Sequence, residues 1–315
     1  MLQMLKCYTR QFQLAFATLA AAVCTGCVAP ATFIDPVTNF QKASTIVITS
    51  ARTEYTGANT VERNAVIDAY AAKRARILDR ENLGDSSIII RSDDLQARLT
   101  ALEALTKHGE LLLALAGSDA AAEAKKSTIQ LGDSLIRLNK ALDDTPNGDF
   151  KIRVTAYSGA AAEIVDAVVQ QKISLALQKA IIASDSAVSA LIAQMRTDMF
   201  LLYERRRSIL GDKRKQEVDR FNAEVTAQNP SPERIDKAAT SLKSATSAYA
   251  DLPLLLGAGE GLDSMADAHQ HLVAYAKSAR SPQDFASMVN AVDAFTARAS
   301  AIAGAVRSAK ASSTE

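Results

Sequence analysis

Apolar residues recur at helical spacing along most of this chain, and glycine and proline divide it into segments. The longest segment without a helix breaker covers about residues 158–227. No proline occurs between Pro146 and Pro230, and Gly211 is the only glycine in residues 160–256. At about 1.5 Å per residue, a helix of this length would extend roughly 100 Å. The pattern therefore predicts one very long helix that needs other helices to cover its apolar face.

An apolar seam runs along the second half of this segment. Its members follow one another at intervals of 3, 4 or 7 residues, as in a coiled coil. They are Ile181, Val188, Ile192, Met195, Met199, Leu202 and Ile209. Earlier in the segment the apolar positions are shifted by one residue relative to that seam, at Val168, Leu175 and Ile182. Such a shift is expected of a straight helix, because its period of 3.6 residues drifts against a heptad repeat. We therefore expect packing within its own bundle, with the core beneath residues 164–209 and residues 211–227 projecting or meeting a partner.

The rest of the chain predicts further helices. Apolar positions three to four apart indicate helices over residues 37–80, 93–117, 119–142, 233–250, 262–279 and 282–310. The sequence thus predicts an all-α fold, an elongated helical bundle in a single domain over residues 37–310, with a frayed tail at 311–315. Phe150, Ile152 and Val154 alternate with polar residues like a strand. Without other strands to pair with, we interpret them as an extended lead-in to the long helix.

Composition narrows the classes of partner. Basic and acidic residues nearly balance, at 36 and 35, whereas nucleic-acid binding needs a basic excess. Aromatic residues are only 5% of the chain and tryptophan is absent, which disfavours sugar-binding and base-stacking surfaces. Hydrophobic residues make up 48%, enough to bury a core. Nucleic acid is therefore not expected as a partner.

The amino terminus has the layout of an export signal. Lys6 and Arg10 precede an apolar run from Phe12 to Val23, which is too short for a typical membrane span. The run ends in Cys24-Thr25-Gly26-Cys27. A small residue before a cysteine resembles the lipobox of the bacterial lipoprotein signal, although Cys24 stands where that signal usually has Leu, Val or Ile.

The resemblance implies cleavage before Cys27 and acylation of that cysteine. Residues 1–26 would be the signal peptide and residues 27–36 a tether, and acyl chains such as palmitate would hold the protein on a membrane. Val28 in place of an aspartate implies the outer membrane, with the protein facing the periplasm. Two other interpretations stay open: an ordinary secretory signal cut at another alanine, and an uncleaved anchor.

The cysteine pattern agrees with the lipoprotein interpretation. The chain has three cysteines, at positions 7, 24 and 27, so the mature body would contain no free thiol and no disulfide. We find no catalytic, cofactor or metal motif in that body. The body resembles, in outline, uncharacterised helical lipoproteins of bacteria, through its helical pattern and leucine-rich segments such as Leu95 to Leu115. That resemblance implies no activity.

A basic stretch on the long helix is the candidate partner surface. Its cations are Arg205, Arg206, Arg207, Lys213, Arg214 and Lys215. Glu204, Asp212, Glu217 and Asp219 are interspersed, so the first interpretation is a solvated face with local ion pairs. The alternative is contact with anionic lipid headgroups, lipopolysaccharide phosphates or an acidic envelope protein.

Three other motifs have simpler explanations. His269 and His271 would point about 200° apart on a helix and so cannot share a metal there, which predicts two surface histidines. The glycine-rich stretch 257–261 lacks the strand and lysine of a phosphate loop, which predicts a flexible link between helices. The apolar stretch 252–256 would plug the core as a loop or dip into a bilayer.

Together these features favour a lipid-anchored, periplasm-facing helical bundle that binds or scaffolds in the cell envelope. A membrane-active bundle, similar in outline to helical pore-forming proteins, is the alternative. A hydrolase of envelope substrates is the third hypothesis, which would require two carboxylates that converge in a deep pocket.

Overall fold

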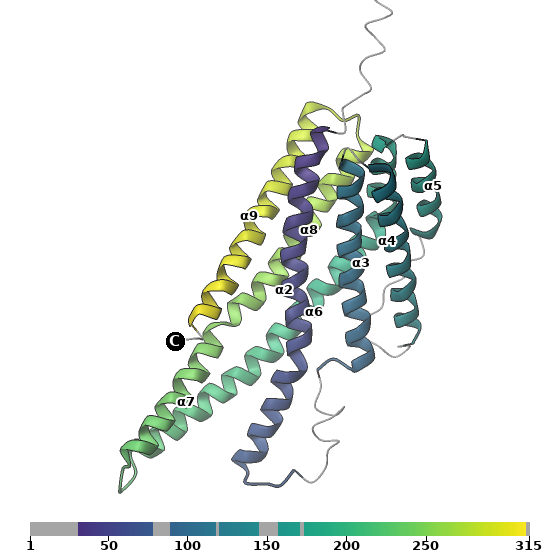
Figure 1. Cartoon of the computed structure of the whole chain (residues 1–315). Helices are drawn as coiled ribbons and strands as arrows, with labels where there is room; N and C mark the ends of the chain where they lie inside the picture. Colours follow the sequence, from purple (N-terminus) through teal and green to yellow (C-terminus); the bar gives the residue numbers. More distant parts are fainter. Residues whose placement is uncertain (1–30, 78–88, 118–119, 145–156, 171–172, 313–315) are drawn as a thin grey trace, which may run out of the picture.

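The computed structural model describes residues 31–77, 89–117, 120–144, 157–170 and 173–312 (Figure 1). All regular secondary structure in these ranges is helical, which confirms the all-α bundle. The helices are α2 (Ala31–Ala72), α3 (Ser92–Ala116), α4 (Ala120–Asp143), α5 (Tyr157–Val169), α6 (Ile173–Val225), α7 (Pro232–Ala250), α8 (Leu252–Lys277) and α9 (Pro282–Ser312).

Helix α6 is the long helix, with 53 residues, but it begins at Ile173 and not near 158. Residues 157–169 form the separate helix α5, which packs against α4 and the start of α6. This arrangement buries Ile164 and Val168 of α5, and Glu163 of α5 pairs with Lys179 of α6 at 3.0 Å. A continuous helix would have left that apolar face without a partner, so tertiary packing breaks the helix where no glycine or proline does.

The core lies where α2, α3, α6 and α8 meet, with α4 outside α3 and α9 covering α2 and α8 (Figure 1). The predicted seam of α6 faces this core, because every seam member from Ile181 to Leu202 is buried. Phe40 of α2 and Phe295 of α9 pack with ring centroids 5.6 Å apart. One cluster of buried residues runs from Phe33 to Ile302 and so includes residues from both ends of the bundle's sequence.

The predicted tether is wrong in its second half, since α2 already begins at Ala31 and contains Pro36. Phe33 is buried against the ring of Tyr275, with centroids 5.0 Å apart, and Val37 is fully buried. Pro36 removes a single backbone hydrogen bond close to the helix start, and we infer that burial of these two side chains outweighs that loss. Helix α2 ends earlier than predicted, just before Arg74 adopts a φ of 53°.

The glycine-rich stretch is helical and not a flexible link. Gly257, Gly259 and Gly261 lie within α8, and a methyl group added at Gly261 would come within 2.8 Å of Ile302 of α9 and Val47 of α2. Leu252, predicted to lie in a loop plug, is buried in the first turn of the same helix. The glycines therefore allow α8 to approach two neighbouring helices closely.

The last part of α6 leaves the bundle, as the fading apolar pattern over residues 211–227 predicted. It pairs with α7 in an antiparallel hairpin that projects at the lower left of Figure 1. Helix α7 starts at the capping residue Ser231, whose side chain accepts from the Arg234 amide, and buries Ala238 and Ala245. Residues 203–230 of α6 and the following turn contain no fully buried residue. We call this unit, residues 203–250, the α6–α7 hairpin.

Candidate functional site

The predicted basic stretch lies where α6 leaves the bundle, and half of its cations bind α2. Arg205 Nε donates to Glu62 at 2.9 Å, and Arg206 Nη1 donates to Glu54 at 2.8 Å. Lys213 Nζ donates to Asp68 at 2.9 Å. The prediction of a face with local ion pairs is therefore wrong for these three, because each partner lies on another helix. They attach the base of the hairpin to α2.

The three ion pairs between α6 and α2 are partly buried. Burial raises the pKa of the Glu54 carboxyl, and the charge and hydrogen bonds of Arg206 partly offset that rise. The hydrogen bonds that Arg205 donates to Glu62 raise the pKa of Arg205. Because such pairs are partly desolvated and join two helices, they fix helix orientation more than the usual exposed ion pair does.

The other three cations face away from α2. The Arg214 guanidinium lies 4.2 Å from the ring centroid of Tyr249 on α7, a cation–π contact. Arg207 lies 3.6 Å from Glu204, one turn earlier on the same helix. Lys215 is exposed. The positive surface available to a partner is therefore smaller than the sequence predicted: Arg207, Arg214 and Lys215.

A groove of about 400 Å³ opens between α2 and the base of the hairpin. Val61 and Ala65 of α2 and Ile209 of α6 supply apolar lining, while the Arg205–Glu62 and Lys213–Asp68 pairs lie across it. The groove is shallow and open to solvent. It can accept side chains of a partner segment, and two of its carboxylates already neutralise cations.

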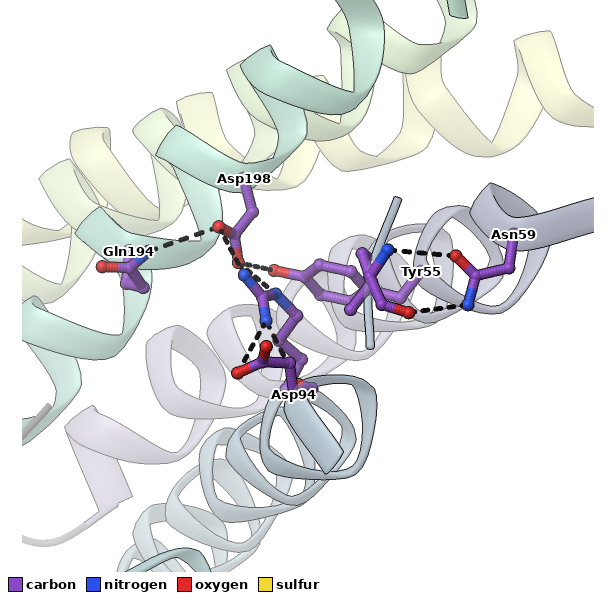
Figure 2. Close-up of polar contacts among 7 residues, drawn as sticks. Tyr55, Asn59, Asp94, Gln194 and Asp198 are labelled. Carbon is purple, nitrogen blue, oxygen red and sulfur yellow. Dashed lines mark hydrogen bonds and ion pairs between the residues drawn. The ribbon is translucent and has the colours of Figure 1, made fainter. Parts of the chain in front are cut away.

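A buried polar cluster joins α2, α3 and α6 (Figure 2). Arg98 of α3 binds both carboxylate oxygens of Asp198 on α6, at 2.8 and 3.2 Å. The Tyr55 hydroxyl of α2 donates to the same carboxylate at 2.9 Å, and Gln194 Nε2 donates to it at 3.2 Å. We call these four residues the Asp198 cluster.

The electrostatics of the cluster are those of a structural tie. Arg98 and Asp198 are 6% and 5% exposed and Tyr55 is fully buried, so a substrate could not reach them. Burial and the neighbouring Asp198 raise the pKa of Tyr55 well above 10, so the phenol remains a hydrogen-bond donor. Arg98 also donates from Nη1 to the Asp94 carbonyl at 3.2 Å. Asp94, in the first turn of α3, is buried beside Arg98.

Asn59 fixes the approach to α3 one turn after Tyr55. Its Nδ2 donates to the Ile90 carbonyl at 2.8 Å, and its Oδ1 accepts from the Ile89 and Ile90 amides at 3.1 and 3.0 Å (Figure 2). The sequence analysis did not predict the Asp198 cluster or the contacts of Asn59. The available signal was a single aspartate, Asp198, next to the seam residue Met199 in a mostly apolar part of α6.

The prediction of surface histidines is wrong for His269, which is completely buried. It stands on the inward face of α8 between Met265 and Leu272, which are also buried. Its ring meets that of buried His108 on α3, with centroids 5.5 Å apart at 77°. His271 lies on another side of α8, with 37% of its side chain exposed. The two α8 histidines therefore do point apart.

Burial dominates the chemistry of the histidine pair. It lowers the pKa of His108 to about 3 and that of His269 to about 4. None of the four ring nitrogens has a hydrogen-bond partner. Across the part of the chain that the structure describes, no group of three or more His, Cys, Asp or Glu side chains could hold a metal ion.

Helix α6 is also the one described helix that is long and apolar enough to cross a membrane. The most apolar 18-residue window has a mean hydropathy of 1.4, and half of it is buried inside the bundle. The core helix of a soluble protein meets the same criterion, so length and composition alone do not distinguish a core helix from a membrane-spanning helix.

Several sequence predictions lie wholly or partly outside the described residues, among them the signal peptide 1–26, the acylated Cys27, the strand-like segment 150–154 and residues 313–315 of the tail. No protein-family model, no curated protein and no solved structure matches this chain.

Proposed function

We propose that this chain is a lipid-anchored protein of the bacterial cell envelope that acts by binding or scaffolding. Residues 1–26 would be removed as a signal peptide, and acyl chains on Cys27 would hold the protein on the outer membrane, facing the periplasm. The lipobox-like sequence and Val28 support this assignment. The helical bundle would then be the working part of the protein.

One observation carries the proposal: Ala31, where α2 begins, and the tip of the α6–α7 hairpin lie at opposite ends of the molecule (Figure 1). Only residues 28–30 separate Cys27 from Ala31. Helix α6 alone, with 53 residues, is about 80 Å long. An anchor at Cys27 would therefore hold the tip of the hairpin tens of ångströms from the membrane.

This geometry favours a protein partner over the protein's own membrane. The outward cations Arg207, Arg214 and Lys215 lie on the hairpin, remote from an anchor at Cys27. Anionic headgroups of the anchoring membrane could not reach them in this arrangement. We propose an acidic face of another envelope protein as the partner, with the groove between α2 and α6 next to it.

Metabolic labelling with palmitate tests the anchor. The intact chain should incorporate the label and sediment with membranes, because the Cys27 thiol and the new amino group would be acylated. Cys27→Ser should lose the label and cleavage at that site. Cys24→Ser is the matched control and should keep both. An intact chain that is exported but carries no label would contradict the proposal.

A second candidate is a membrane-active bundle, for which α6 is long and apolar enough. It predicts that the body without acyl chains releases dye from liposomes, whereas a scaffold leaves them intact. The structure gives less support to a hydrolase, since Glu62 and Asp68 in the groove each bind a cation.

A further inference from the structure

The His108–His269 contact joins two helices that pack mainly on others. Helix α3 packs on α2, α4 and α6, and α8 packs on α6, α9 and α2. The two rings meet edge to face in the core between them, and each side chain is at most 1% exposed. A buried imidazole normally has at least one hydrogen-bond partner, but neither of these has one. The pair is therefore compatible with burial only while both rings are neutral.

Few charges can compensate a proton on either ring. Asp185 of α6 lies 3.7 Å from His269 Nε2, but the same carboxylate binds Lys277 of α8 at 3.2 Å and accepts from Ser189 at 3.3 Å. Lys277 lowers the pKa of His269, opposing Asp185, which raises it. Next to His108 on α3, Lys107 and Glu110 neutralise each other at 2.7 Å. No charged side chain of α2, α4 or α9 contributes to the pKa of either ring.

A second contact limits where the bundle can open. Arg98, ten residues before His108 on α3, holds the first half of that helix to α6 through Asp198. Helices α3 and α4 pack extensively on each other, so they would move as a unit. Separation of the second half of α3 would therefore hinge at the Asp198 cluster.

We propose that the His108–His269 pair is an acid-sensitive latch, whose protonation separates the second half of α3, with α4, from α6 and α8. Two imidazolium rings in contact would repel each other, and burial would disfavour the charge on each ring until the helices part. Opening would expose apolar residues of the core that are covered at neutral pH. Helix α7 of the hairpin packs on α6 and α8 and would keep its structure. This inference does not depend on the lipid anchor.

The difference in proton binding between the closed and open states sets the direction of the pH dependence. Burial lowers the pKa of both rings from 6.5, to about 3 and about 4, so the open state binds more protons than the closed state below pH 6.5. Closure is therefore at full strength above that pH and weakens as the pH falls toward 4. Between pH 7.5 and 5.0 the opening constant should rise about 30-fold for each histidine exposed, or several hundred-fold for both.

Hydrogen exchange of the full chain at pH 7.5 and 5.0 tests the latch. Protection factors, corrected for the intrinsic pH dependence of exchange, should fall by the several hundred-fold given above over residues 105–116 and in α4. Those of α7 should change little. The His108→Leu/His269→Leu variant should lose most of this dependence, and each single variant should keep about 30-fold. His271→Gln, on the same helix, should behave like the parent chain.

Two results would overturn the latch. One is an unchanged pH dependence in the double variant, or in both single variants if the double variant does not fold. The other is equal loss of protection in α3, α4 and α7, which would indicate ordinary acid unfolding of the whole bundle.

Discussion

Replacing Asp198 by alanine should lower the free energy of unfolding by about 3–5 kcal/mol, because it removes the carboxylate to which the buried Arg98 guanidinium donates two hydrogen bonds. Asp94 is already a partner of Arg98, but at the longer distance of 3.9 Å between Oδ1 and Nη1, so we expect it to replace only part of the lost interaction. Tyr55 would lose the acceptor for its hydroxyl as well. Urea unfolding at pH 7.5, followed by circular dichroism, measures the change.

Two companion variants separate the charge effect from a loss of packing. Arg98→Met/Asp198→Leu should recover most of the loss, because replacing both members of a buried pair by apolar residues is often neutral or stabilising. Gln194→Ala removes one peripheral donor and should cost about 1 kcal/mol. A loss below 1 kcal/mol in Asp198→Ala would show that the cluster does not hold α2, α3 and α6 together.

Gly261→Ala should destabilise the bundle by about 1–3 kcal/mol, because the added methyl group overlaps Ile302 and Val47 and forces α8 away from α9 and α2. The matched control is Gly132→Ala in α4, where no atom lies within 4 Å of the added methyl group. That change should leave stability unchanged or raise it by about 0.5–1 kcal/mol, since alanine favours helix. The same urea titration compares them, and equal effects at the two sites would contradict the packing assigned to α8.

The sequence predicted those parts of the fold that a local pattern specifies. The seam from Ile181 to Leu202 repeats at helical intervals, and its burial follows from that period. The fading of the seam after Ile209 predicted where α6 leaves the bundle. The helix starts predicted at residues 233 and 282 lie within one residue of the starts of α7 and α9, because the serine and proline at each start act within one turn.

The errors arose where long-range packing decides. Nothing local ends a helix near residue 170, so the separation of α5 from α6 depends on the surfaces that α4 and α6 offer to α5. The glycines of α8 are poor helix formers in isolation, but Val47 and Ile302 require their missing side chains. Pro36 is likewise retained within α2, where the burial of Phe33 and Val37 favours the helix.

The candidate sites also divide into those that a local motif reveals and those that depend on long-range packing. The lipobox-like sequence at Cys27 is a local motif, so it can be recognised without a fold. His269 could have been assigned to the core, since it follows Met265 and precedes Leu272 at helical spacing, but its meeting with His108 needs the arrangement of α3 and α8. The partners of Arg205, Arg206 and Lys213 lie more than 140 residues away in the sequence, at Glu62, Glu54 and Asp68.

Energy transfer to the membrane tests the central claim, that the anchor and the α6–α7 hairpin lie at opposite ends. The acylated protein would be placed in liposomes that carry acceptor dyes on their headgroups, with a donor dye on Gln228→Cys in the hairpin turn. Asp35→Cys, exposed at the start of α2, is the matched control position. We predict strong transfer from position 35 and little from position 228, because the turn between α6 and α7 lies at the opposite end of the molecule from the start of α2. Equal transfer from the two positions would contradict the account, because the hairpin would then lie on the membrane.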